Sequence, residues 1–124
     1  MTISYEEFKK VEIRAGKILS AERIPDTDKL LKLSVDFGEK KENILPDGTK
    51  ENISAPRQIV SGISLHFPDP AVLIGKTCMF VTNLEPRTIR GFESNGMLFA
   101  VSGPDGQFSI LEPNSTILPG NLAA

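Results

Sequence analysis

Hydrophobic and polar residues alternate along two long stretches near the start of the chain. Their apolar members are Val11, Ile13, Ala15, Leu19 and Ala21 in the first, and Leu31, Leu33, Val35 and Phe37 in the second. A period of two places successive side chains on opposite faces of a strand. Residues 11–22 and 30–37 are therefore predicted to be half-buried strands. The turn-forming sequence RIPDTDK between them predicts that they pair as a hairpin.

Gly16 interrupts the first predicted strand. A glycine inside a strand commonly marks a bulge or a sharp bend. We expect the strand to bend at this point, because a small antiparallel sheet must curl in order to close on itself.

Two short helices are predicted. Ser4 and Glu7 match a capping box, which indicates a helix over residues 4–10. The sequence DPAVLIG, residues 69–75, has an N-cap aspartate, a proline at the first helical position and a glycine past the end. These features are typical of a single helical turn that joins two strands.

The rest of the chain divides into strands and one polar segment. Further strands are predicted over residues 57–64, 77–84, 96–102 and 107–111. Residues 39–56 are polar and contain Pro46-Asp47-Gly48, so they are predicted to be a mobile insertion that contains a weak hairpin.

About five short antiparallel strands, with a helical turn between the third and the fourth, are typical of an all-β OB-fold barrel with short helices. An SH3-like barrel is the alternative architecture. The length of 124 residues fits a single domain over residues 1–124. The apolar sequence from 107 to 124 exceeds what a five-stranded barrel needs, so it is predicted to be a C-terminal β extension that forms a homodimer. The alternative is that this tail folds back on its own barrel.

Composition narrows the function classes. The chain is 40% hydrophobic and 24% charged, as in ordinary soluble proteins, and it has no apolar run long enough to cross a membrane. Without a pattern typical of a signal peptide, a cytoplasmic location is expected. The net charge is −2, and the charged residues between 70 and 107 balance to zero. Any nucleic-acid site must therefore be a local patch.

The residue types for catalysis or metal binding are scarce. The chain has one histidine, His66, and one cysteine, Cys78, so no catalytic dyad is available. Asp26-Thr27-Asp28 lacks the glycine and glutamate of a calcium loop. We expect no metal, no cofactor and no enzyme activity. His66 is interpreted as a partly exposed residue or a nucleobase-stacking one, and Cys78 as a buried hydrophobe or a reactive thiol.

The sequence NLEPRTIRGFESNGM, residues 83–97, holds Arg87 and Arg90 in a predicted loop between two strands. One interpretation is that these arginines are solvated and paired with Glu85 and Glu93. The other is that a loop shaped by proline and glycine presents them to phosphates, since a guanidinium donates two parallel hydrogen bonds.

Five blocks then resemble a known family. VEIRAGKI (11–18), PDTDKLLKL (25–33), RQIVSGI (57–63), NLEPRTIRG (83–91) and SNGM (94–97) are similar to the tRNA-binding domain at the C-terminus of many bacterial methionyl-tRNA synthetases. Similar domains occur as free-standing dimers and in cytokine-like synthetase cofactors. The resemblance implies an OB-fold that binds the outer corner of tRNA without reading the anticodon.

The resemblance also implies RNA-binding residues. The family's asparagine, basic residue, serine and methionine fall on Asn83, Arg87, Ser94 and Met97, and Lys29 matches a basic position on the same face. With Arg90, these residues are the predicted site. The chain differs from the family pattern at Asn95, where glutamate is usual, and in the insertion at 39–56.

The predicted function is a non-catalytic tRNA-binding module that assists a methionyl-tRNA synthetase, in the same chain or as a separate partner. A related branch of the fold binds peptides, so a peptide-binding chaperone or assembly adaptor is the alternative function. An RNA-modifying enzyme is the third.

Overall fold

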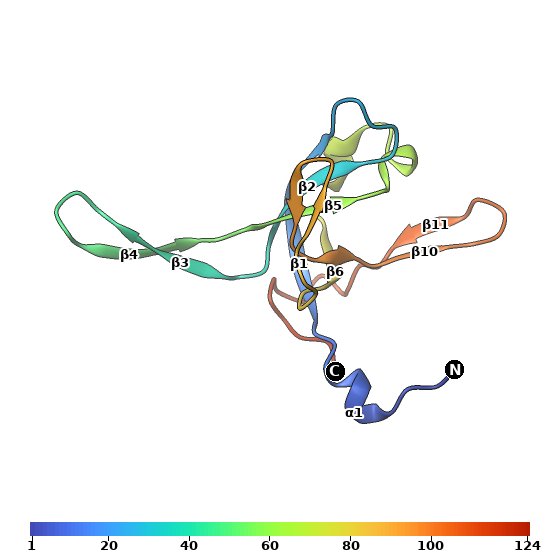
Figure 1. Cartoon of the computed structure of the whole chain (residues 1–124), viewed down its shortest axis with the longest axis horizontal. Helices are drawn as coiled ribbons and strands as arrows, with labels where there is room; N and C mark the ends of the chain where they lie inside the picture. The colour runs from blue at the N-terminus through green and yellow to red at the C-terminus, as the bar shows by residue number, and fades with distance from the viewer.

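The computed structural model describes residues 1–124, and its centre is a five-stranded antiparallel sheet (Figure 1). The sheet runs in the order β5-β2-β1-β6-β9. Its strands are β1 (Ile13–Arg23), β2 (Leu31–Asp36), β5 (Arg57–Ser61), β6 (Thr77–Val81) and β9 (Met97–Leu98). The sheet curls into a nearly closed barrel, which confirms the predicted all-β OB-type fold. The predicted hairpin is the antiparallel pair β1–β2.

Three further hairpins and three short helices surround this sheet (Figure 1). The hairpins are β3 (Lys40–Ile44) with β4 (Lys50–Ser54), β7 (Arg87–Ile89) with β8 (Phe92–Ser94), and β10 (Ala100–Ser102) with β11 (Phe108–Ile110). The helices are α1 (Tyr5–Phe8), the 3₁₀ helix η1 (Ser64–His66) and the 3₁₀ helix η2 (Pro70–Leu73). Ser4 and Glu7 form the predicted capping box, and Asp69 caps η2 as predicted.

Two predicted segments need correction. Residues 96–102 do not form one strand, because β9 belongs to the barrel whereas β10 pairs with β11 outside it. Residues 83–97 are not simply a loop, since they contain the β7–β8 hairpin. The hairpin predicted within residues 39–56 is present as β3–β4, which projects away from the barrel in Figure 1.

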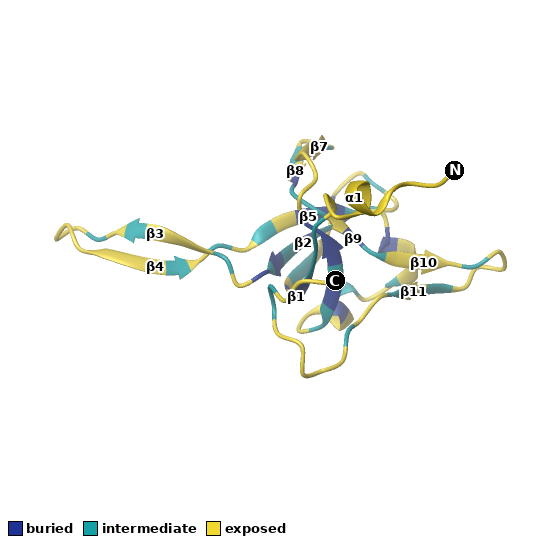
Figure 2. Cartoon of the chain, turned by 90° about the horizontal axis from the view of Figure 1, so that it is seen from below, coloured by how far each residue is buried: buried dark blue, intermediate teal, exposed yellow.

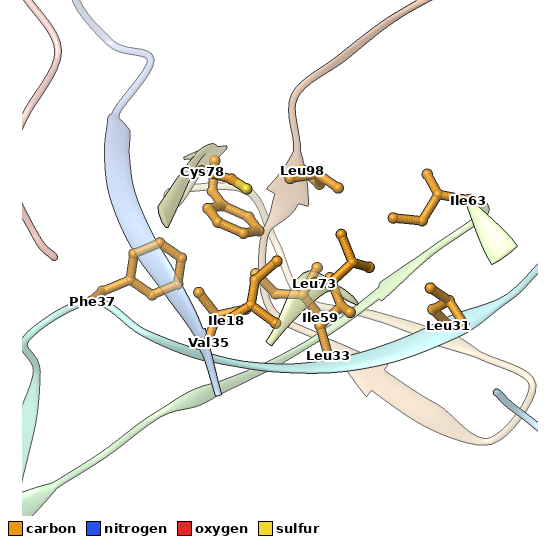
Figure 3. Close-up of a cluster of buried hydrophobic side chains, with 11 residues drawn as sticks. Ile18, Leu31, Leu33, Val35, Phe37, Ile59, Ile63, Leu73, Cys78 and Leu98 are labelled. Atoms are coloured by element: carbon orange, nitrogen blue, oxygen red, sulfur yellow. The ribbon is translucent and has the colours of Figure 1, made fainter. Parts of the chain in front are cut away.

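The core fills the interior of the barrel with aliphatic and aromatic side chains (Figure 3). Leu31, Leu33 and Val35 of β2 alternate inward as predicted, and Leu73 reaches the same cluster from η2. Cys78 is fully buried within it, which confirms its interpretation as a small buried hydrophobe. Burial raises the pKa of the Cys78 thiol to about 11, so the thiol stays protonated near neutral pH.

The bulge in β1 lies close to the predicted bend but not at Gly16 itself. The register of β1 against β2 shifts between Ile18 and Ser20, so Leu19 lies in a bulge. The predicted alternation already changes before this shift: Ala15 and Gly16 are both buried, Ile18 is fully buried, and Leu19 is 42% exposed. Gly16 has another role: a Cβ atom there would lie 2.5 Å from Phe37 Cε1 and 2.6 Å from Val35 Cγ1. Glycine lets these core side chains pack directly against the β1 backbone.

A network of hydrogen bonds from charged side chains connects strands at the end of the barrel where β6 finishes. Arg57 donates two hydrogen bonds to Glu39, at 2.7 and 2.8 Å, and a third of 2.6 Å to the carbonyl oxygen of Thr82. The Thr82 hydroxyl and Arg14 both donate to Glu12, each at 2.7 Å. Hydrogen bonds from Arg57 hold the pKa of Glu39 below its usual value, and those from Arg14 and Thr82 do the same for Glu12. The network therefore links β1, β5 and β6 just before residue 83.

The chain end folds back onto β1. Gly120 N donates to Ala15 O at 2.7 Å, and Ala15 N donates to Asn121 O at 2.9 Å. These bonds satisfy the stretch of β1 that β2 leaves unpaired. The predicted C-terminal β extension is thus the β10–β11 hairpin, which starts at Ala100, followed by a tail paired with its own barrel.

Substituting Gly16 with alanine should destabilise the fold. The added methyl group must displace Phe37 and Val35, and overpacking of this kind costs about 1–3 kcal/mol. Urea unfolding of Gly16→Ala would measure the loss. Gly62→Ala is the matched control, because a Cβ at Gly62 meets no atom within 4 Å. Equal stability of the two variants would contradict this account of Gly16.

Candidate nucleic-acid interface

The β7–β8 hairpin carries the two arginines that the sequence singled out. Its pairs are Arg87 with Ser94, Thr88 with Glu93 and Ile89 with Phe92, which leaves a two-residue turn at Arg90-Gly91. Both turn residues have positive φ, 52° at Arg90 and 85° at Gly91, as a primed hairpin turn requires. Asn-Gly or Asp-Gly would have predicted this turn from sequence, but Arg-Gly carries a weak signal. Sequence reasoning therefore missed the hairpin.

A positive φ is uncommon for a residue with a long side chain. Arg90 and Asp26 are the only non-glycine residues of the chain with this conformation. Backbone strain of this type persists where the surroundings enforce it, and it is found often at functional sites. Arg90 is exposed and lies in the turn at the tip of the β7–β8 hairpin. Figure 2 shows this hairpin projecting from the barrel.

The hairpin is fixed to the barrel by its second strand and the residues that follow. Ser94 is buried, and its hydroxyl oxygen accepts a 2.9 Å hydrogen bond from Val60 N and donates to Gly96 O. Asn95 N donates to Gln58 O at 2.8 Å. The barrel thus closes between β5 and residues 94–95 through the Ser94 side chain and the Asn95 backbone amide.

On the outer side of β2, a cation holds the same hairpin. The Lys32 ammonium lies 4.9 Å from the centre of the Phe92 ring, within the range of a cation–π contact. The hairpin is therefore attached to both β2 and β5, and its position does not depend on a single contact.

Asn83 occupies the base of the loop, where both ends of its amide are bonded. Its Oδ1 accepts from Glu12 N at 2.8 Å, and its Nδ2 donates to Lys10 O at 2.5 Å. Among the predicted site residues, Asn83 and Ser94 thus have internal partners, and each positions the loop.

The three predicted cations have no such partners. Lys29, Arg87 and Arg90 are exposed, and none forms an ion pair or a side-chain hydrogen bond. The ion pairs of Arg87 and Arg90 with Glu85 and Glu93 that one interpretation required are therefore absent. By contrast, Arg14 and Arg57 are ion-paired, and Arg23 donates to the carbonyl oxygen of Pro68.

The predicted residues gather in two recesses. Lys29 and Arg90 line the first, of about 370 Å³, together with the carboxylates of Asp26 and Asp28. The second is about 520 Å³ in volume. Arg87, Ser94 and Met97 line it with Val60, Leu84, Glu85, Ile89 and Gly96. Sequence reasoning did not find Leu84 or Ile89, because single aliphatic residues in a loop carry no signal.

In OB-folds, the face of the second and third strands and the two flanking loops bind oligonucleotides and oligosaccharides. Here β2 and β5 are these strands. Lys29 lies in the connection between β1 and β2, and Arg87 and Arg90 lie in the connection between β6 and β9. The structure thus brings the predicted cations to the face that this fold commonly uses.

Only one face of the His66 ring is free for stacking with a nucleobase. It lies in η1, and its ring stacks on Phe108 of β11 at a centroid distance of 3.9 Å. One ring face is therefore occupied. No group of three or more histidine, cysteine, aspartate or glutamate side chains is arranged to hold a metal ion. None of the helices has the length and apolar character needed to cross a membrane.

With this geometry in place, comparison with known proteins gives the family. Residues 13–122 match the family model described as "Putative tRNA binding domain". The chain belongs to this tRNA-binding domain family. The predicted resemblance to a tRNA-binding domain family is thereby confirmed.

Individual relatives agree with this assignment. The methionine–tRNA ligase of Methanoregula boonei is 44% identical over 118 residues, which are 95% of this chain and 15% of the ligase. The chain spans about 15% of the length of the curated relatives that it matches.

Solved structures extend the likeness to the whole chain. A MetRS-related protein from Pyrococcus horikoshii is 32% identical with a TM-score of 0.82, over 100% of this chain and 99% of that one. The CsaA chaperone protein from Picrophilus torridus is 25% identical with a TM-score of 0.77, over 99% of this chain and 100% of that one.

Removing the Ser94 hydroxyl should destabilise the tRNA-binding domain. Ser94→Ala leaves the buried Val60 amide without its acceptor, which costs about 1–3 kcal/mol. Urea unfolding would measure this loss. Ser109→Ala is a control, because the Ser109 hydroxyl is exposed and donates only to the neighbouring Ile110 carbonyl. If Ser94→Ala proved as stable as the control, the closing bond would not carry the role assigned to it.

Proposed function

We propose that this domain holds the outer corner of tRNA through backbone phosphates and shape, and that it thereby assists a methionyl-tRNA synthetase, as part of it or as a separate partner. The observation that carries this proposal is that Arg87 and Arg90, which form no ion pair, lie together on a strained hairpin at the rim of the barrel. A guanidinium with no internal partner retains all its donors for phosphate oxygens.

The number of exposed cations determines how much of the tRNA affinity is electrostatic. Lys29, Arg87 and Arg90 can neutralise about three phosphates, and each neutralised phosphate releases counterions. The net charge of −2 and the nearby Asp26 and Asp28 limit long-range attraction. Affinity must therefore come from local contacts and from the fit to a folded RNA, because duplex RNA is recognised chiefly through backbone and 2′-hydroxyl geometry.

The link to a synthetase rests on the relatives. Methionine–tRNA ligases contain a segment similar to nearly all of this chain. A module that holds tRNA at a site remote from the anticodon raises the effective concentration of substrate at the partner's active site. We infer the same role here, in the cytoplasm.

The alternative function is a peptide-binding chaperone, favoured by the likeness to a CsaA chaperone protein. A gel shift with mixed tRNA and an aggregation-suppression assay with an unfolded client distinguish the two. Retarded tRNA without protection of the client supports tRNA holding, and protection without retardation supports the chaperone.

We also propose a homodimer that involves residues 107–124. Leu118 and Leu122 remain 66% and 61% exposed after the tail has paired with β1. Tyr5 and Phe8 of α1 adjoin Leu122 in a groove of about 320 Å³. Exposed apolar clusters of this kind are typically covered by a partner subunit. Sedimentation at micromolar concentration should show twice the mass of the chain, and a 13.5 kDa species would contradict the dimer.

Arg87→Ala should weaken binding to all tRNAs about equally. The loss of one phosphate contact flattens the slope of log affinity against log salt by about one unit, from a starting slope of roughly −2 to −4. Filter binding over a salt series would measure both. Lys41→Ala removes an exposed cation from β3, away from the site, and should change neither. If Arg87→Ala behaves like this control, the β7–β8 hairpin is not the RNA site.

Arg90→Asn should separate stability from binding. Asparagine tolerates positive φ better than arginine, and Asn-Gly is the preferred pair for this turn. The variant should be about 0.5–1 kcal/mol more stable in urea unfolding. Its affinity for tRNA should nevertheless fall, since a phosphate contact is lost. Unchanged affinity together with raised stability would show that the Arg90 conformation serves no contact with RNA.

A further inference from the structure

The recess beside Arg87 has features that phosphate binding does not explain. Its walls include four aliphatic side chains, those of Val60, Leu84, Ile89 and Met97. Its volume of about 520 Å³ is within the range of sites for small molecules, roughly 300–1,000 Å³. A site for phosphates alone has no use for such walls.

Two of these walls are unusually exposed. Leu84 and Met97 are 46% and 48% exposed, although both line the same concave surface. Ser94 and Met97 are both among the RNA-binding residues that the family resemblance implies. The structure assigns the floor to the buried Ser94 and leaves Met97 as an open wall. The recess is thus open to an apolar group from outside.

The polar groups of the recess indicate which hydrogen-bonding and charged groups the ligand must have in addition to its apolar part. Arg87 is an unpaired donor on the rim, whereas the Glu85 carboxylate can only accept hydrogen bonds when it is ionised. The Ser94 hydroxyl is already engaged with Val60 and Gly96. A phosphate inside the recess would meet aliphatic walls and a carboxylate. A flat ring with N–H groups on its edge could donate hydrogen bonds to Glu85. A phosphate attached to the same molecule could accept hydrogen bonds from Arg87.

We propose that this recess takes one unstacked nucleobase of the bound tRNA, between Leu84 and Met97, with the adjacent phosphate on Arg87. This inference rests on the proposed function and names the part of the RNA that the recess receives. Every base has an apolar face, so insertion is tolerant of sequence. The carboxylate of Glu85 favours bases that present amino groups, namely guanine, adenine and cytosine.

The three methionines of the chain allow a direct test: Met1, Met79 and Met97. Protein labelled with ¹³C in the methionine methyl groups would be titrated with mixed tRNA and observed by NMR. A base against Met97 should shift its methyl resonance upfield through the ring current and give nuclear Overhauser contacts to aromatic RNA protons. Met79, on β6 and paired with Ala15, serves as the internal control and should not move.

Sodium triphosphate is the probe for phosphate binding alone. It should leave the Met97 methyl unshifted, since it carries no ring. If tRNA binds but the Met97 methyl shows neither shift nor contact, the base is not in this recess, while the proposed tRNA-holding function stands. If tRNA does not bind, both fail. If an unfolded peptide moves Met97 and tRNA does not, the recess is a peptide site and the inference is wrong.

Variants give a second readout. Leu84→Ala should weaken tRNA binding about five- to ten-fold without changing the salt slope, because an apolar contact releases no counterions. Ile44→Ala, which removes an exposed side chain from β3, is the control and should bind as the unaltered chain does. Leu84 is half-exposed, so its loss should leave the fold intact, which thermal unfolding would verify. A Leu84→Ala variant that binds like Ile44→Ala would overturn the proposal.

Discussion

The hydrogen bond from the Val60 amide to the Ser94 hydroxyl joins the barrel to its candidate RNA surface. β5 is the outermost strand of the sheet, and an unpaired strand edge leaves backbone donors without acceptors. In this domain a serine side chain and the Asn95 amide complete that edge. The same residues end the β7–β8 hairpin, so closing the barrel also sets the position of both arginines. Residues 94 and 95 therefore contribute both to barrel closure and to the position of the site.

The charge of the whole chain is a poor guide to this surface. Of its five arginines, Arg14 and Arg57 are bound in ion pairs and Arg23 is bound to a carbonyl oxygen. Those residues hold strands and segments together. Only Arg87 and Arg90 keep their donors free, and both are on the hairpin. A chain with a net charge of −2 can thus offer a small cationic site, because the acidic residues that line the same recesses form no ion pair with Arg87 or Arg90.

The site combines cations with apolar walls, and the two features make different demands on a ligand. Cations attract any phosphate backbone. An apolar recess, by contrast, accepts only an exposed apolar group, such as an unstacked base or the side chain of an unfolded peptide. Together they favour an RNA that is folded but has an unstacked base near its surface. The same walls could accept an unfolded peptide, which is consistent with the likeness of this fold to a CsaA chaperone protein.

Local pattern was sufficient for most of the fold. The alternation of Leu31, Leu33 and Val35, the capping box at Ser4 and the turn at Asp69 were predicted correctly, because each depends on residues close in sequence. The motifs around residues 83–97 also led to the family and to the arginines of the candidate site.

Tertiary structure alone decided the roles of individual residues. Asn83 and Ser94 were predicted as RNA contacts, but their side chains bond to atoms 71 and 34 residues away in sequence. The bulge of β1 lies at Leu19, and Gly16 is instead the position where Phe37 and Val35 pack against the backbone. The recess likewise joins Val60 to Leu84 and Met97. Contacts between distant segments follow from barrel closure and core packing, which no local pattern of the sequence records.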